Sequence, residues 1–160
     1  MIPNSFWKWY ERHYRINVGL AAFLFLWQLV HLYWLTTDVV AGRLFGESFF
    51  EPSEFWRILL ILVDYTEIPA IVATSLVYIN ELRKDRNLKS FLLLFFINSQ
   101  WLHILWITDE FVIKTFVGDQ QLGFPVWLAW LAIGIDYLEL PVIYDTIKKF
   151  FRPPVDIQPG

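Results

Sequence analysis

Residues 21–35 read AAFLFLWQLVHLYWL and residues 90–107 read SFLLLFFINSQWLHILWI, and both stretches are apolar on every side of a helix. A helix of a water-soluble bundle instead has one apolar stripe and one charged face. A helix needs roughly 20 mainly apolar residues to cross the hydrocarbon core of a bilayer. The two stretches therefore predict membrane-spanning helices and argue against a water-soluble four-helix bundle.

Two further segments of the chain have the same character. The predicted spans are residues 16–37, 55–79, 90–108 and 126–147, and the segments between them are short and contain turn formers such as Gly46, Pro52 and Gly118. The N-terminal residues lack the short apolar core and cleavage site of a secretory signal, so the first span is expected to remain as an anchor. We therefore predict an all-α membrane protein, a bundle of four transmembrane helices with residues 1–160 in a single membrane domain.

The amino-acid composition also fits a protein that is embedded in a lipid bilayer. Apolar residues make up 56% of the 160 positions, and the 9 Trp and 15 Phe suit a protein with aromatic belts at the membrane interfaces. Trp34 and Trp106 are interpreted as such interfacial anchors. The chain has no Cys, which excludes disulfides, iron–sulfur clusters and thiolate metal sites. A net charge of −3 without a basic aromatic patch argues against nucleic acid as a partner.

Lys and Arg near the span ends predict the orientation. Cytoplasmic flanks are enriched in these residues. They gather in the N-terminal flank, in the segment between the second and third spans, and in the C-terminal flank. The residues are Lys8, Arg12, Arg15, Arg83, Lys84, Arg86, Lys89, Lys148, Lys149 and Arg152. Both termini are therefore predicted to be cytoplasmic, in a plasma or inner membrane, and Asp145 near the inner end of the fourth span is predicted to face headgroups.

Polar residues recur along the chain at a constant shift of 72 residues, which indicates an internal repeat. Such residues are rare in membrane spans, so their matches are more informative than matches among Leu and Phe. We interpret the pattern as a tandem duplication of a two-helix unit, residues 16–79 and 88–151, with a pseudo-two-fold axis along the membrane normal. The pairs are Gln28 and Gln100, His31 and His103, Trp34 and Trp106, Thr36 and Thr108, Asp64 and Asp136, Tyr65 and Tyr137, Glu67 and Glu139, and Pro69 and Pro141.

Two carboxylates lie three residues apart in each even-numbered span, within DYTEIP (64–69) and DYLELP (136–141), and so share a helix face. A charge near the bilayer centre costs roughly 2.5–3.5 kcal/mol even on lenient scales. The four acids are therefore expected to face the bundle interior, where protons, partners or cations offset their charge. No Lys or Arg stands deep in any span. The predicted metal ligands are His31, Asp64, Glu67, His103, Asp136 and Glu139.

Mixed imidazole and carboxylate ligands suit iron, manganese or zinc. Soluble di-iron and di-manganese bundles use a similar inventory of Glu and His on four helices, although with a different distribution. We therefore predict two divalent metal ions, with iron favoured. Gln28 and Gln100, one turn before each His, are expected to orient the ligands, while Tyr65 and Tyr137 point about 100° away from the adjacent Asp. Pro69 and Pro141 each remove a helical hydrogen bond and are expected to kink the helix.

Several functions remain open at this level. A buried dinuclear centre without thiolates favours an oxidoreductase that acts on dioxygen or on a lipophilic substrate, such as a quinol or an acyl chain. One alternative is a transporter or sensor of divalent cations or protons, which the very apolar inner halves of the first and third spans disfavour. Another is a zinc-dependent hydrolase. Two further possibilities are a purely structural network of protonated acids and a heme held by His31 and His103, and four acids at the same depth argue against the heme.

Overall fold

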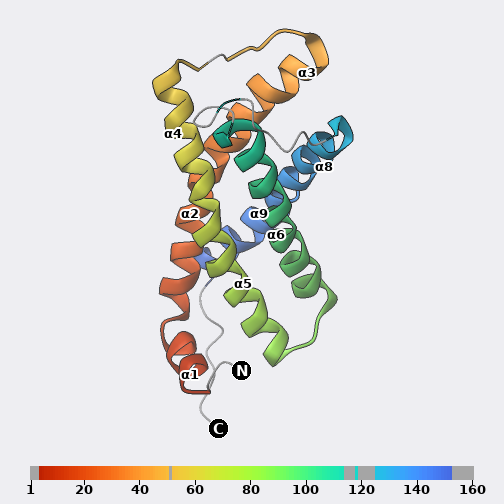
Figure 1. Cartoon of the computed structure of the whole chain (residues 1–160). Helices are drawn as coiled ribbons and strands as arrows, with labels where there is room; N and C mark the ends of the chain where they lie inside the picture. Colours follow the sequence, from red (N-terminus) through yellow and green to blue (C-terminus); the bar gives the residue numbers. More distant parts are fainter. Residues whose placement is uncertain (1–3, 51, 114–117, 119–124, 153–160) are drawn as a thin grey trace.

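The computed structural model describes residues 4–50, 52–113, 118 and 125–152, and this part of the chain is helical without any strand. Figure 1 shows the helices running up and down beside one another. Two π-helical segments, η1 and η2, continue helices α2 and α6. The elements are α1 (Asn4–Arg12), α2 (Tyr14–Trp34), η1 (Leu35–Val40), α3 (Ala41–Phe45), α4 (Glu54–Tyr65), α5 (Glu67–Lys84), α6 (Leu88–Ile107), η2 (Thr108–Ile113), α8 (Val126–Tyr137) and α9 (Glu139–Phe151).

Four helical stretches are long and apolar enough to cross a membrane: Tyr14–Phe45, Ile58–Lys84, Leu88–Ile107 and Val126–Phe151. The prediction of an all-helical protein with four such helices is confirmed. Three of the helical stretches extend well past the predicted spans, because a helix ends where its backbone is interrupted and not where its apolar segment ends. The first continues to Gly46, whose φ of +76° is a left-handed conformation that favours glycine.

Both helix interruptions expected from the prolines are present. The helix that contains Asp64 breaks at Thr66, between α4 and α5, three residues before Pro69. The one that contains Asp136 breaks at Leu138, between α8 and α9, three residues before Pro141. A proline cannot donate the hydrogen bond that would continue the helix. Each interruption therefore falls between the Asp and the Glu of one pair.

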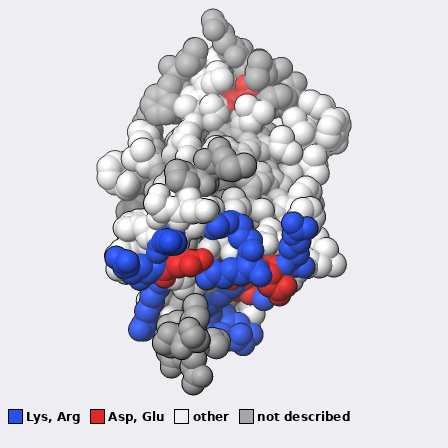
Figure 2. All heavy atoms as spheres, turned by 90° about the horizontal axis from the view of Figure 1, so that it is seen from below, with Lys and Arg blue, Asp and Glu red and all other residues white. Residues whose placement is uncertain are grey.

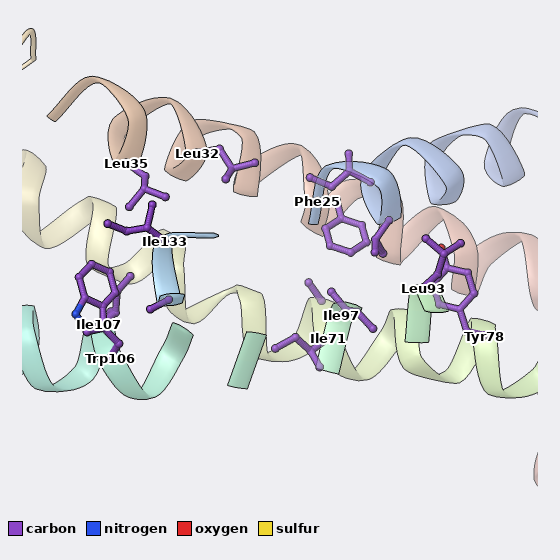
Figure 3. Close-up of a cluster of buried hydrophobic side chains, with 14 of the residues drawn as sticks. Phe25, Leu32, Leu35, Ile71, Tyr78, Leu93, Ile97, Trp106, Ile107 and Ile133 are labelled. Atoms are coloured by element: carbon purple, nitrogen blue, oxygen red, sulfur yellow. The ribbon is translucent and has the colours of Figure 1, made fainter. Parts of the chain in front are cut away.

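The core runs along the bundle axis between the four helical stretches (Figure 3). Leu35, Ile107 and Ile133 lie together toward one end of this cluster, whereas Phe25 and Ile97 lie farther along it. On α2 and α6, the two His stand between these groups in sequence. A buried polar layer is thus enclosed by apolar side chains on both sides.

Large apolar side chains also cover much of the outside of the bundle. Phe23, Leu26, Phe91 and Phe95 are more than half exposed, although they lie in the middle of α2 and in the first half of α6. In water, so large an apolar surface would drive association. In a bilayer the same surface contacts lipid chains, as expected of an integral membrane protein.

One end of the bundle holds α1 and the turn between α5 and α6 (Figure 1). Trp7 and Tyr10 of α1 pack with Val77 of α5, and the Arg83 guanidinium lies over the Trp7 ring at 4.2 Å. Lys and Arg side chains gather across this end, which Figure 2 shows from below. The three basic flanks of the sequence therefore meet on one face.

Asp145 does not face headgroups as predicted, because its side chain is buried at this basic end. It accepts hydrogen bonds from Lys89 and from the Tyr78 hydroxyl, and it pairs with Lys149 at 2.6 Å. Lys149 also contacts Glu81 at 2.8 Å. Asp145 has no counterpart in the first half of the sequence, where Ala73 stands, so the repeat gave no indication of this ion-pair cluster.

Removing Lys149, the cation that Asp145 and Glu81 share, is expected to destabilise the bundle. In Lys149→Met, Glu81 loses its lysine partner, whereas Asp145 keeps Lys89. Because the Lys149–Glu81 ion pair is only partly exposed, the loss in free energy of unfolding should lie between the ~1 kcal/mol of a surface pair and the ~3–5 kcal/mol of a buried one. Thermal unfolding in detergent would measure it as a midpoint lowered by several degrees. Lys148→Met, at an exposed neighbour, is the control, and an equal shift there would contradict the assignment.

Candidate metal centre

The six acid and imidazole residues singled out from the sequence are all buried and lie close together between the four helices. Two groups have ligand atoms within 4.8 Å of one another: His31, His103 and Asp136 form one, and Glu67, Asp136 and Glu139 form the other. Asp136 belongs to both groups. Asp64 belongs to neither, but its carboxylate contacts the Nδ1 atom of His31.

His31 lies between two carboxylates. Its Nδ1 contacts Asp64, and its Nε2 lies 3.0 Å from an Asp136 oxygen. A neutral imidazole has one N–H, so it can donate only one of these two hydrogen bonds. The other contact requires a second proton, on the ring or on the facing carboxyl group, or a cation between nitrogen and oxygen. The ring of His103 lies 5.3 Å from that of His31, and its Nε2 is 3.8 Å from Asp136.

The two glutamates of the layer are deeply buried and, within the described part of the chain, lack hydrogen-bond partners at most of their carboxylate oxygens. Glu67 is 2% and Glu139 0% exposed. Neither oxygen of Glu139, nor Oε1 of Glu67, has a hydrogen-bond partner among the described residues. Burying an ionised carboxylate without compensation is prohibitively costly, so such groups bind protons, pair with cations or coordinate metals. No Lys or Arg occurs in residues 58–82, 90–113 or 126–147 of the chain to provide that charge.

Gln28 and Gln100 contact the helix interruptions rather than the imidazoles. The Gln28 amide donates to the Val63 carbonyl at 3.3 Å and to the Thr66 hydroxyl at 3.0 Å. The Gln100 amide donates to the carbonyl of Ile135 at 3.0 Å. These bonds attach α2 to the end of α4, and α6 to the end of α8, next to Asp64 and Asp136. The glutamines therefore position the ligand-bearing backbone.

Tyr65 and Tyr137 hydrogen-bond to threonines on other helices and not to the acids. The Tyr65 hydroxyl lies 2.9 Å from that of Thr108, and the Tyr137 hydroxyl lies 2.7 Å from that of Thr36. Both threonines belong to the π-helical segments η1 and η2. π-Helical turns are rare overall, and many of those that do occur are found at functional sites.

Trp34 and Trp106 are not interfacial anchors, because each is only 2% exposed within the bundle. The Trp34 ring lies 5.7 Å from the ring of His31, and the Trp106 ring lies at the same distance from that of His103. The three-residue spacing between each His and Trp could have indicated this, since such residues share a helix face. The indoles cover the layer of polar groups on the side away from the basic end of the bundle.

A narrow pocket reaches this layer from one side of the bundle. Asp64, Glu67 and His103 line it together with Tyr65, Ile104 and Ile107, and it contains about 170 Å³ of space free of atoms. That space is too narrow to hold a water molecule. The pocket lies between α4–α5 and α6.

Comparisons with protein-family models, curated proteins and solved structures found no match for this chain. The arrangement of buried imidazoles and carboxylates is therefore the basis for a functional proposal.

The glutamine contacts can be tested apart from any ligand. Gln100→Leu removes the hydrogen bond to the Ile135 carbonyl, which is expected to lower the free energy of unfolding by about 1 kcal/mol. Thermal unfolding in detergent should show a lower midpoint. Asn98→Leu, at an exposed position two residues earlier, is the control, because its amide bonds to Ser75 and not to a helix interruption. A midpoint unchanged in Gln100→Leu would contradict a structural role for this glutamine.

Proposed function

We propose that this protein is a membrane oxidoreductase with a dinuclear metal centre held by His31, Asp64, Glu67, His103, Asp136 and Glu139. The observation that carries the proposal is that both oxygens of Glu139 and Oε1 of Glu67 lack hydrogen-bond partners in the described structure and are buried beside Asp136, while no described Lys or Arg is buried. The polar layer thus offers oxygen and nitrogen ligands and lacks positive charge.

The charge of the layer fits two divalent cations. Four ionised carboxylates and two neutral imidazoles carry four negative charges, which two divalent cations would neutralise. Asp136 belongs to both ligand groups and could help to hold either ion. Imidazole and carboxylate ligands suit iron, manganese and zinc, and iron or manganese would add redox chemistry. Zinc would instead favour hydrolysis, for which the layer offers no separate nucleophile.

The tandem duplication is part of this proposal. It is supported by equivalent contacts at a shift of 72 residues: Gln28 to Val63 and Gln100 to Ile135, and Tyr137 to Thr36 and Tyr65 to Thr108. The interruptions at Thr66 and Leu138 have the same spacing. A pseudo-two-fold axis along the membrane normal would bring both halves to one central site.

The orientation is proposed from the basic end of the bundle. Cytoplasmic flanks carry the excess of Lys and Arg. The end in Figure 2, with α1 and the α5–α6 turn, would therefore face the cytoplasm of a plasma or inner membrane, and both termini would lie there. Asp64 and His31 would then lie in the outer half of the bilayer.

A lipid-soluble reductant and dioxygen are the reactants that best fit a centre in this position. In the balanced reaction, two quinols give four electrons and four protons to one dioxygen, which yields two quinones and two waters. The metal ions would supply the redox capacity. The unpartnered oxygens of Glu67 and Glu139 would accept protons from the quinol hydroxyls. Burial would keep bulk water away from the reaction.

Transport of cations or protons is the weaker alternative. Between the acids and the ion pairs of the basic end stand Phe25, Ile71, Ile97, Val142 and Ile143, all buried. The layer is predominantly apolar, and the buried hydroxyl of Thr74, one turn beyond Ile71, is among the few hydrogen-bonding groups that a crossing ion would meet. A transporter needs access from both sides, and the inner side is closed by this layer.

The metal content of the purified protein tests the proposal. After growth with iron and manganese supplied, we expect about two equivalents of redox metal per chain by elemental mass spectrometry, in line with two sites for four carboxylates. Asp136→Asn should lose both ions, because Asp136 belongs to both ligand groups. The double variant Glu67→Gln with Glu139→Gln should retain fewer metal ions per chain than the native protein.

Asp145→Asn is the matched control, since it changes a buried carboxylate at the other end of the same span. It should keep the native metal content. A folded native protein without bound metal would refute the dinuclear centre and leave a network of protonated acids. Two equivalents of zinc alone would refute the redox reaction and favour the hydrolase.

A further inference from the structure

We infer that a lipid-soluble quinol reaches the acids from the bilayer, through the pocket between α4–α5 and α6, and that Tyr65 and Thr108 form its gate. This inference rests on the proposed function and specifies its substrate class and its route. Three of the six proposed ligands, Asp64, Glu67 and His103, line the inner part of this pocket. A molecule held there would contact the proposed centre directly.

The mouth of the pocket faces lipid. Tyr65 and Ile104 line the pocket and are partly exposed. One turn before Tyr65 stands Leu62, which is 59% exposed, and one turn before Ile104 stands Trp101, which is 45% exposed. Tyr65 lies seven residues from the start of the Ile58–Lys84 span, about 10 Å along the helix. The mouth therefore opens at the depth of the acyl chains.

The hydrogen bond between Tyr65 and Thr108 holds this side of the bundle closed. It joins the end of α4 to the start of η2 across the helices that border the pocket, with 2.9 Å between the hydroxyl oxygens. Because the pocket is too narrow for a water molecule, an entering ring has to displace side chains. A quinol hydroxyl can replace either partner of this bond, so breaking it costs little once the substrate is present.

The chemistry of the pocket wall changes from outside to inside in the order that a quinol requires. Ile104 and Ile107 provide apolar contacts for the ring and its tail. The Tyr65 and Thr108 hydroxyls can hydrogen-bond a ring oxygen at the mouth. The Glu67 carboxylate at the inner end can accept a hydroxyl proton. A purely apolar acyl chain would leave these polar groups without partners.

Photoaffinity labelling tests the route without requiring turnover. The native protein in lipid nanodiscs is illuminated with an azido-quinone, and labelled residues are mapped by mass spectrometry with and without excess unlabelled decylubiquinone. We expect competed labelling on α4–α5 around Tyr65 and on α6 around Ile104. Ile104→Trp fills the mouth and should abolish the competed labelling. Ile104→Ala widens the mouth and should increase the competed labelling. Leu92→Trp, exposed elsewhere on α6, should label as the native chain does.

The chain provides its own control for the gate. Tyr65→Phe and Tyr137→Phe remove the same hydroxyl from the two tyrosine–threonine pairs. Labelling beside Ile104 should rise in Tyr65→Phe and stay unchanged in Tyr137→Phe. The inference would be overturned if Tyr65→Phe and Tyr137→Phe changed the labelling equally, or if the label appeared beside Tyr137 instead. Labelling that persists in Ile104→Trp would also overturn it.

The metal content of the same samples separates the two proposals. Bound redox metal without competed labelling refutes the quinol route and leaves the dinuclear centre standing. Competed labelling in a chain that binds no metal refutes the dinuclear centre while supporting the pocket as a quinone site.

Discussion

The burial of four carboxylates in an apolar bundle is the constraint on which the rest of this structure depends. Each acid is 3% exposed or less, and no Lys or Arg is buried in the part of the chain that the structure describes. At low dielectric, like charges at this spacing repel one another strongly, so the folded state requires protons or cations among them. A protonated network would satisfy the charge, but it would leave the isolated oxygens of Glu139 without hydrogen-bond partners among the described residues. Two divalent cations would satisfy both charge and coordination.

The helix interruptions make this density of acids possible. In an uninterrupted helix, residues at positions i and i+3 project at nearly fixed angles. The breaks at Thr66 and Leu138 separate each Asp from its Glu, so that α4 and α5, and likewise α8 and α9, can adjust independently. The glutamines then fix the loosened backbone to the helix that carries the neighbouring His. The positions of the four carboxylates therefore depend on the backbone geometry at the two helix interruptions as well as on the side-chain conformations.

The sequence predicted the helices and the membership of the polar layer, because apolar length and rare buried acids are local signals. It did not predict that Trp34 and Trp106 cover the imidazoles, since an aromatic residue near a span end fits the interface and the core equally well. It placed Asp145 wrongly, because an acid near the end of a span is ordinarily solvated, and its partner Lys89 lies on another helix, although Lys149 lies one turn later on the same helix. It also could not rank the six ligands, which depends on distances between helices.

The two halves of the layer are not equivalent, despite their matched residues. His31 contacts two acids, whereas His103 lies 3.8 Å from one, and Asp64 stands outside the ligand groups that contain Asp136. One sequence difference accounts for part of this. Gln28 is shared between a carbonyl and the hydroxyl of Thr66, but Leu138 stands at the matching position, so Gln100 bonds to carbonyls alone and one of them belongs to Asp136. The Asp136 backbone is therefore held directly and the Asp64 backbone is not. The pocket that Asp64 lines borders this less constrained backbone, and Asp136 is not among its lining residues.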